Sequence, residues 1–358
     1  TNGRHGTMPP PDMMPDLPVT FLPVENNHFN TVWHTLARFL KDQRPCIYVP
    51  NYDYVASAIS PVIHPNVGVV GIAHSDDVEH YEHVDRLGRY WDRIVAVSKF
   101  IEGEIGDLNP KFVDKTRTIY YGVPFDEATA RARVDARTYT NDDPLVLTYT
   151  GRMVVHQKNI FAYATLAERL RDAGVPFRLN LLGDGEQYDQ LRWKMGGLVD
   201  AGVVNMPGRV TPLQIAKELE HTDVFVLLSD FEGLPLSMLE AMSLGVIPVI
   251  REMKSGIPEV ITTGKNGFIT SRSDLGAMVE VLKDLQSKPE RRRSLRHAVI
   301  DSFIKHRLRK SDMVDDYASL FEQLFIELQG RPLPRAMPMA YNAPVYGVAA
   351  PPFLFRSE

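Results

Sequence analysis

Two glutamates, Glu232 and Glu240, lie eight residues apart around a Gly-Leu-Pro turn. The apolar run at 224–228 before them is typical of a strand buried in a parallel sheet, and apolar residues at helical spacing follow from Leu236. About two helical turns separate the glutamates, so one carboxylate lies at the mouth of this helix and the other flanks it. Because helix N-termini attract anions, the stretch predicts an anion site. The alternative is a helix with surface glutamates.

Two cations, Arg152 and Lys158, lie six residues apart in a loop between a predicted strand at 145–150 and a helix that starts near Ile160. A diphosphate leaving group needs fixed positive charges, one of them able to make forked hydrogen bonds. The spacing therefore predicts a diphosphate clamp. Two solvated loop cations are the alternative.

His74 directly follows the apolar run at 67–73, which predicts another buried strand. A neutral histidine there can donate to a sugar hydroxyl or to a developing charge. The alternative is a turn histidine that bonds to the local backbone.

Glycines also follow two further predicted strands. Gly183 and Gly185 come after the strand at 177–182, and Gly208 comes after the strand at 203–206. Glycines let a backbone approach a ligand closely, although an ordinary turn also explains them.

Five segments follow one another at 151–159, 182–186, 207–210, 232–240 and 255–259. Their order and residue types resemble the donor-binding half of retaining nucleotide-sugar glycosyltransferases with the GT-B fold, closest to glycosyltransferase family 4. The resemblance covers about residues 145–270. It implies an α/β protein with two Rossmann-like, doubly wound parallel-sheet domains that face a cleft.

The resemblance also implies a role for individual residues. The resemblance implies catalytic roles for Glu232, His74, Arg152 and Lys158. Binding of the nucleotide-sugar donor falls to Arg152, Lys158, Gly183, Gly185, Gly208, Arg209, Val210, Gly233, Leu234 and Glu240. In this scheme Glu232 contacts the transferred sugar and Glu240 the ribose, while Glu259 is structural.

No metal or other cofactor is expected, since GT-B enzymes typically use basic residues and helix N-termini in place of a metal. The histidines at 74, 80 and 83 and the acidic pair Asp76-Asp77 are therefore not assigned to an ion. A solvated helix face is expected for His80, Glu82, His83 and Asp85.

The remaining pattern predicts five regions. They are a flexible arm at 1–18, an N-terminal acceptor-side domain at 19–143, a donor-binding domain at 144–272, C-terminal helices at 273–329 and a proline-rich tail at 330–358. In the N-terminal domain we expect strands at 19–23, 46–49, 67–73 and 93–98, helices at 31–41 and from 99, a closing segment at 119–123 and an exit linker at 126–143. This domain lacks the opening strand and glycine-rich loop of the family, so it is expected to be shortened.

Bulk properties narrow the class of protein. A formal charge of −5 over 358 residues gives no general attraction to nucleic acid. The single cysteine, Cys46, excludes an internal disulfide framework and fits a cytoplasmic protein. The basic run at 288–310 predicts either a solvated helix face or a peripheral contact with anionic lipids at the inner face of the membrane.

Together these features predict a metal-independent, retaining transferase that moves a sugar from a nucleoside diphosphate to a hydroxyl acceptor, which is a glycan, a lipid-linked sugar or a small molecule. A GT-B nucleotide-sugar epimerase and a non-catalytic donor-binding or scaffold protein are the alternatives. The base, the sugar, the acceptor and the oligomeric state stay open.

Overall fold

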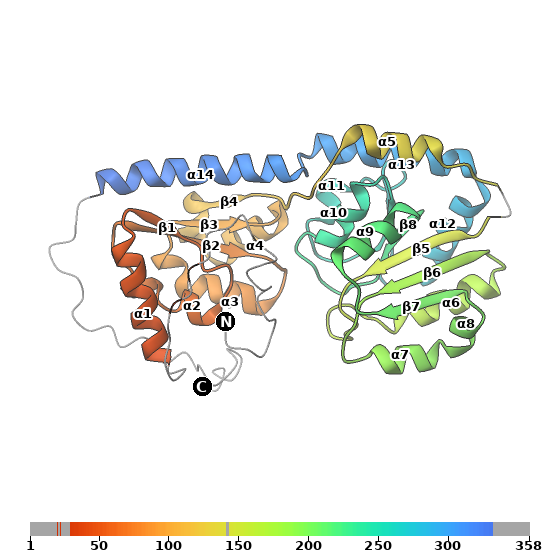
Figure 1. Ribbon diagram of the computed structural model, residues 1–358, viewed down its shortest axis with the longest axis horizontal. Coiled ribbons are helices and arrows are strands. Elements are labelled where there is room, and N and C mark those ends of the chain that lie inside the picture. The colour runs from red at the N-terminus through yellow and green to blue at the C-terminus, as the bar shows by residue number, and fades with distance from the viewer. Residues whose placement is uncertain (1–19, 21, 23–28, 141–142, 332–358) are drawn as a thin grey trace.

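The computed structural model describes residues 20, 22, 29–140 and 143–331, which form two parallel sheets flanked by helices (Figure 1). The predicted arm at 1–18 lies outside the described residues. The predicted strand at 19–23 and the tail at 330–358 lie outside them except at positions 20, 22, 330 and 331.

The N-terminal sheet consists of four parallel strands in the order β1-β2-β3-β4. They are β1 (Cys46–Tyr48), β2 (Val67–Ala73), β3 (Arg93–Ala96) and β4 (Thr116–Thr118). All seven residues of β2 are buried, as its unbroken apolar sequence predicts for a central strand. The closing segment expected at 119–123 is not a strand. Pairing ends at Thr118, and the chain then leaves the sheet toward Arg309, with which Val123 forms an isolated bridge.

The helices around this sheet are α1 (Phe29–Asp42), α2 (Tyr54–Ser57), α3 (Val78–Leu87) and α4 (Lys99–Leu108), with 3-10 turns at Ser60–Val62, Gly88–Tyr90 and Pro110–Lys115. Side-chain caps fix where helices begin. Asp77 accepts from the backbone N–H of His80, and Ser98 from that of Ile101. The expected solvated face of α3 is wrong for His80 and His83, because both rings are buried within an aromatic cluster.

The C-terminal sheet has six parallel strands in the order β10-β9-β8-β5-β6-β7. They are β5 (Leu145–Thr150), β6 (Phe177–Leu182), β7 (Val204–Gly208), β8 (Val224–Leu227), β9 (Ile247–Arg251) and β10 (Phe268–Thr270). The chain starts in the centre, builds outward to β7, returns to pair β8 with β5, and builds outward on the other side. This sheet is therefore doubly wound, with its switch point between β5 and β8.

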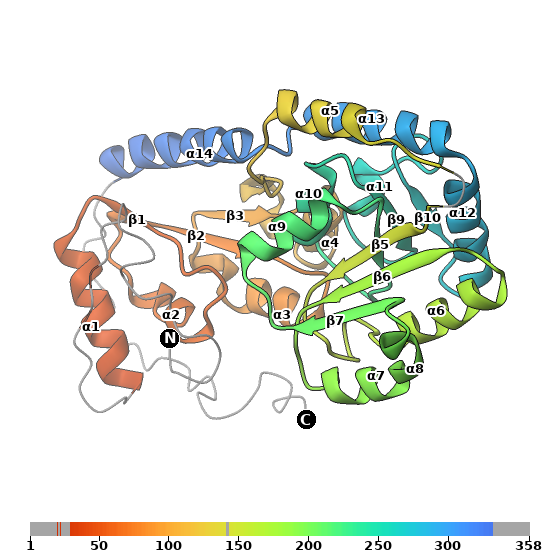
Figure 2. The same cartoon turned by 45° about the vertical axis from the view of Figure 1, so that its right-hand side comes forward.

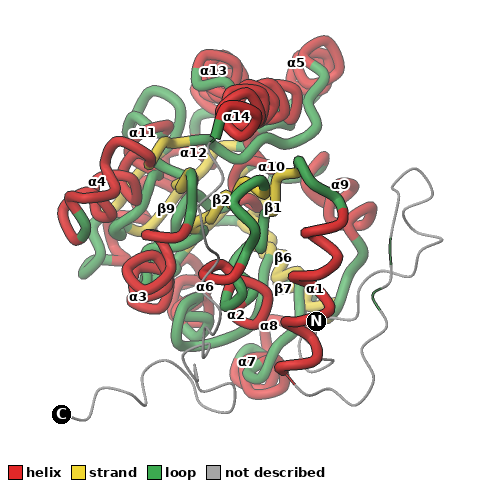
Figure 3. The backbone as a smooth tube through the Cα atoms, turned by 90° about the vertical axis from the view of Figure 1, so that its left-hand side faces the viewer, coloured by secondary structure: helices red, strands yellow, loops and turns green. Residues whose placement is uncertain are grey.

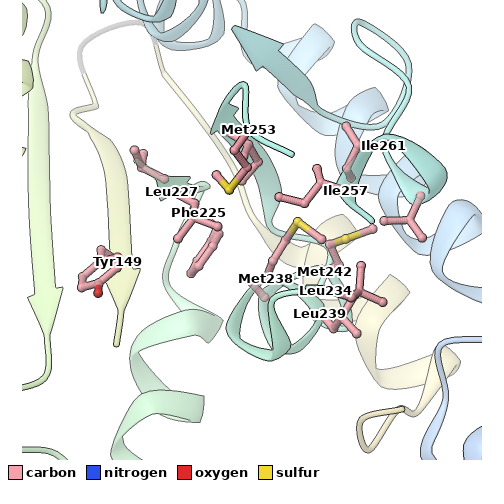
Figure 4. Packing of buried hydrophobic residues seen from close by; sticks show 14 of the residues in the cluster. Tyr149, Phe225, Leu227, Leu234, Met238, Leu239, Met242, Met253, Ile257 and Ile261 are labelled. Carbon is pink, nitrogen blue, oxygen red and sulfur yellow. The ribbon is translucent and has the colours of Figure 1, made fainter. Parts of the chain in front are cut away.

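Its connecting helices are α6 (Ala162–Asp172), α7 (Tyr188–Lys194), α8 (Gly196–Asp200), α9 (Pro212–Glu220), α10 (Leu236–Met242) and α11 (Ile257–Val260). The apolar side of α10, with Met238, Leu239 and Met242, packs in one buried cluster with Met253 and Ile257 (Figure 4). This packing anchors the turn that precedes α10.

The predicted exit linker at 126–143 contains a helix, α5 (Glu127–Ala136). Its buried residues are the small Ala130 and Val134, which pack on Ile300 of α13 (Pro289–Lys305). Because the surrounding sequence is polar, this narrow apolar stripe gave little helical signal.

After α13 the chain crosses back to its first domain. After α12 (Leu275–Ser287) and α13, helix α14 (Lys310–Gly330) lies along the N-terminal sheet, where Leu324 and Leu328 meet Gly68. Figure 3 shows α5, α13 and α14 gathered on one side of the molecule. Among the described helices, none is both long enough and apolar enough to span a bilayer.

The basic run at 288–310 is neither a simple solvated face nor a continuous lipid-facing patch. Arg292 and Arg296 on α13 are buried, each within 3.9 Å of the buried carboxylate of Asp223. The Arg296 Nε also donates to the backbone oxygen of Gly245 at 2.9 Å. These two cations therefore hold α13 to the domain core, because a buried charge requires a partner.

Candidate active site

Two loops meet at the switch point of the C-terminal sheet, one after β5 and one after β8. In open α/β sheets, ligands bind outside the carboxyl ends of the strands at this point. Figure 1 shows β5 and β6 pointing toward the N-terminal domain, and Figure 2 shows the same boundary from another side. The predicted diphosphate clamp and the turn that carries Glu232 thus lie where a ligand is expected.

Lys158 and Glu232 form an ion pair across these loops, with 2.5 Å between Nζ and Oε1. Their side chains are only 16% and 8% exposed. Removal of two charges from water is costly, so such a pair persists only with good geometry and further hydrogen bonds. The pair places an ammonium group beside a carboxylate at the switch point.

Gln157 connects this pair to Arg152. Its Nε2 donates to Glu232 Oε2 and to the Phe231 carbonyl, both at 3.4 Å, and its Oε1 accepts from Arg152 Nη2 at 3.0 Å. The backbone N–H of Asp230 also donates to the Gln157 carbonyl at 2.8 Å. The sequence interpretation missed Gln157, because a neutral amide between two predicted cations carries no recognisable pattern.

Arg152 is exposed, whereas Glu240 on α10 is about half buried. Burial raises the pKa of the Glu240 carboxyl. Within the described part of the chain, no side chain or backbone group donates a hydrogen bond to that carboxyl. Its acceptor capacity is therefore available at the edge of the site.

The turn that contains Gly183 and Gly185, after β6, packs against the loop after β5. A Cβ on Gly183, whose φ is 143°, would lie 1.9 Å from the Gly151 carbonyl oxygen, and one on Gly185 would lie 2.5 Å from the Met153 carbonyl oxygen. The sequence interpretation assigned these glycines to close approach of a ligand. In the structure their absent side chains make room for the neighbouring strand-end loop.

Gly208 ends β7 with a left-handed φ of 81°, and its carbonyl accepts from the Gly183 N–H at 3.1 Å. The next residues, Arg209 and Val210, are exposed and partly exposed. The segment predicted to contact the base thus lies next to the Gly183 turn. Leu234 is buried in the core, so only its backbone can face a ligand.

The N-terminal domain touches this site at His74. A Cβ on Gly233 would lie 2.3 Å from the His74 carbonyl oxygen, so the turn after β8 and the end of β2 are in direct contact. The structure thereby brings His74 beside the Glu232–Gly233 turn, from the opposite domain.

The His74 ring is held on both nitrogens. Its Nδ1 pairs with the Tyr121 hydroxyl, and its Nε2 lies 3.0 Å from the Asn51 Oδ1. Burial, together with the neighbouring His80, lowers the pKa of His74 to about 4. The neutral ring with the proton on Nε2 fits these partners, because Asn51 Oδ1 can only accept.

Asn51 and Tyr52 both have left-handed backbones, with φ of 47° and 61°. Such conformations are uncommon outside glycine and cluster at functional sites. Tyr52 stacks on the buried His80 at 3.6 Å between ring centroids, and His80 Nδ1 lies 2.8 Å from Asp77. Asn51 and Tyr121, which hold His74, gave no signal in sequence because they lie far from it along the chain.

A cleft of about 1100 Å³ lies between the domains. From the C-terminal domain it is lined by Arg152, the 154–157 loop, Glu186, Gln187 and Phe231, and from the N-terminal domain by residues 76–79 and Glu82. Over the described ranges, no group of three or more His, Cys, Asp or Glu side chains is arranged to hold a metal ion.

Residues 131–301 match the family model of the glycosyl transferases group 1. This part of the chain is similar in sequence to the group 1 glycosyl transferases. The chain is 30% identical over 229 residues to the putative colanic acid biosynthesis glycosyltransferase WcaL of Salmonella typhimurium, and this match covers 60% of the chain and 53% of WcaL. The chain thus spans about half the length of that relative. The lipopolysaccharide 1,6-galactosyltransferase of Escherichia coli is 23% identical to this chain, and the match covers 70% of this chain and 68% of the galactosyltransferase.

Solved structures confirm the predicted GT-B fold for the two domains of this chain. TarM of S. aureus, in a complex that includes UDP, superposes with a TM-score of 0.67 at 17% identity, over 81% of this chain and 58% of TarM. The lipopolysaccharide outer core galactosyltransferase WaaB superposes with a TM-score of 0.61 at 18% identity, over 82% and 80% of the two chains. At such identities the similarity concerns the fold.

Proposed function

We propose that this protein is a retaining glycosyltransferase of the hexosyltransferase class that uses a nucleoside diphosphate sugar and needs no metal ion. The observation that carries this proposal is the Lys158–Glu232 ion pair, linked to Arg152 through Gln157 at the switch point. It gathers two cations and one carboxylate within one hydrogen-bonded network. That combination suits a diphosphate next to a sugar.

In the proposed reaction the bond between the anomeric carbon and the diphosphate breaks, the acceptor oxygen bonds to that carbon, and the proton of the acceptor hydroxyl passes to the departing diphosphate. Arg152 and Lys158 stabilise the negative charge on the departing diphosphate. A phosphate oxygen near Lys158 competes with Glu232 for the ammonium group, which frees the Glu232 carboxylate for the sugar hydroxyls. Retention of configuration follows from the family resemblance.

The remaining roles complete the proposal. Glu240 accepts hydrogen bonds from the ribose hydroxyls. The backbone of Gly233 and Leu234 orients the sugar, and His74 contacts the same sugar from the other domain. The backbones at Gly183, Gly185, Gly208, Arg209 and Val210 border the nucleoside and base. UDP is the first nucleotide to test, because three proteins of similar fold have UDP in their solved structures.

The proposed acceptor is a hydroxyl on a glycan, since the named relatives include enzymes of colanic acid and lipopolysaccharide synthesis. A cytoplasmic location, at the inner membrane face if the acceptor is lipid-linked, belongs to the same proposal. Burial of Arg292 and Arg296 leaves fewer basic residues of α13 for such a membrane contact.

The first test is a thermal-shift screen of the protein against UDP, GDP, ADP and TDP and their sugars, with and without EDTA. A ligand that binds only the folded state stabilises it by about 2.7 kcal/mol at one hundred times its Kd. Stabilisation by one nucleotide that persists in EDTA supports the donor site and its independence of metal. The absence of any shift contradicts the donor site.

The second test incubates the protein with the stabilising nucleotide sugar alone and with oligosaccharide acceptors, and follows the products by NMR. A glycoside with retained anomeric configuration supports the proposal. Conversion of the donor alone to an epimer favours the epimerase instead. Donor binding without any product favours the scaffold protein.

A further inference from the structure

Glu259 on α11, in the C-terminal domain, contacts the amino end of α4 in the N-terminal domain. Its Oε1 accepts from the Phe100 N–H at 2.7 Å, and its Oε2 accepts from the Lys99 N–H at 3.0 Å and from the Tyr120 hydroxyl at 2.7 Å. Figures 2 and 3 both show α4 near α11. One carboxylate thus joins the domains through three hydrogen bonds.

The amino end of α4 suits this contact. The first N–H groups of a helix have no partner within the helix, and they carry the positive end of its dipole. The cap Ser98 satisfies the Ile101 N–H, whereas Lys99 and Phe100 donate to Glu259. A charged acceptor makes stronger hydrogen bonds than a neutral one, so the contact depends on the carboxylate.

The same segment touches the candidate active site. The Gly256 N–H donates to the Gly233 carbonyl at 2.7 Å, and a Cβ on Gly256 would lie 2.4 Å from the Ser98 Cβ. Gly233 in turn lies against His74. Glu259, the turn after β8 and the ends of β2 and β3 are therefore one continuous set of contacts between the domains.

We propose that Glu259 is a positioning residue, which holds the two domains in the arrangement where the Glu232–Gly233 turn meets His74. Its effect on sugar transfer rests on the proposed function above, whereas its effect on the domain contact does not. Glu259 itself does not bind the donor in this proposal.

The experiment compares Glu259→Gln and Glu259→Ala with the wild-type protein. Glutamine keeps the shape and one acceptor oxygen, and alanine removes both. Glu252→Gln is the matched control, because Glu252 is exposed shortly before the same segment and its carboxylate has no partner among the described residues.

The first measurement is hydrogen–deuterium exchange of peptides that cover residues 98–103. Loss of a hydrogen bond to a charged group is expected to speed exchange of the Lys99 and Phe100 amides about tenfold or more in Glu259→Ala. The Gln variant is expected to lie between alanine and wild type, and the control to match wild type. Unchanged exchange in both Glu259 variants overturns the contact.

The second measurement compares the Kd for UDP with kcat for transfer. A small misplacement of reacting groups costs about 100-fold in rate, so Glu259→Ala is expected to lower kcat by that order while the Kd for UDP stays within about threefold. Unchanged kcat despite faster amide exchange overturns the positioning role. A parallel loss of UDP affinity also overturns it, since Glu259 would then belong to the donor site.

The two proposals fail separately. If wild-type protein binds no nucleotide and makes no product, the proposed function is wrong, and faster exchange at Lys99 and Phe100 still supports the interdomain role of Glu259. If transfer is normal in wild type and in Glu259→Ala, the proposed function stands and the positioning role is wrong.

Discussion

The buried ion pair between Lys158 and Glu232 joins two of the residues to which we assign catalytic roles. Both side chains lie largely out of water, and Gln157 shares its hydrogen bonds with Glu232 and Arg152. A sequence pattern can predict that these residue types occur near a strand end. It cannot predict that they bond to each other, because their pairing depends on how two loops far apart in the chain are placed by the sheet.

Glu232→Gln tests the role of the carboxylate with little change in shape. We expect loss of sugar transfer, because a neutral amide cannot balance the charge next to the sugar, and a loss of stability of about 1 to 3 kcal/mol, because Lys158 keeps a weaker acceptor. Steady-state kinetics and urea unfolding measure the two effects. Glu252→Gln, at an exposed position outside the cleft lining, is the control; full activity of Glu232→Gln would remove Glu232 from the mechanism.

His83 provides a test of pH dependence. Burial above all, together with the nearby His80 and Arg86, lowers the pKa of this histidine from an ordinary value of 6.5 to about 3. The unfolded chain therefore binds a proton below pH 6.5 that the folded chain rejects until about pH 3. Stability from this group is complete above pH 6.5 and declines as the pH falls toward 3.

The variant His83→Phe keeps an aromatic ring in the cluster and removes the titration. We expect its unfolding free energy to fall less steeply than that of wild type between pH 6.5 and pH 4, measured by denaturant unfolding. Trp193→Phe, which replaces an exposed and non-titrating ring on α7, should leave the wild-type slope unchanged. Equal slopes in wild type and His83→Phe would show that His83 does not titrate differently on folding.

At the scale of elements, strand-end loops assemble the site by packing on one another. The Gly183 backbone fits against the Gly151 carbonyl only because it has no Cβ. We expect Gly183→Ala to cost about 2 kcal/mol or more, since both its φ of 143° and the 1.9 Å approach oppose a side chain. Gly196→Ala, where an added Cβ meets nothing within 4 Å, is expected to change stability by at most about 0.5 kcal/mol.

Thermal unfolding of the two alanine variants checks this difference. The Kd for UDP in Gly183→Ala, at a temperature where it is folded, shows whether the loop contact also sets the donor site. Equal stability of the two variants would mean that the loops can separate at no cost, and that these glycines do not maintain the loop contact.

Sequence patterns predicted the buried strands of both sheets well, because an apolar run such as β2 has one stable location in a parallel sheet. They failed for α5 and for the arginines of α13. Helix α5 buries only small side chains, and Arg292 and Arg296 are buried by partners that are distant in sequence. Amphipathic periodicity predicts neither the narrow apolar stripe of α5 nor the burial of the two arginines, because both depend on which element packs opposite.

At the scale of the whole molecule, helix α14 packs on the N-terminal domain. Helix α14 follows the C-terminal domain in sequence, yet Leu324 and Leu328 pack against Gly68 of β2. The N-terminal sheet thus depends on α14 for one of its covered faces (Figure 1). A substitution on the buried side of α14 should therefore destabilise the N-terminal domain first.

Leu324→Ala tests this dependence. Leu324 is fully buried, and truncation of a buried leucine costs about 2 to 5 kcal/mol, so we expect a lower Tm for unfolding of the N-terminal domain. Ile326→Ala is the control, because Ile326 is 70% exposed on the same helix. Calorimetry measures the transition, and hydrogen exchange of β2 peptides shows where it occurs. Faster exchange confined to β5–β10 in Leu324→Ala would contradict the packing of α14 on the N-terminal sheet.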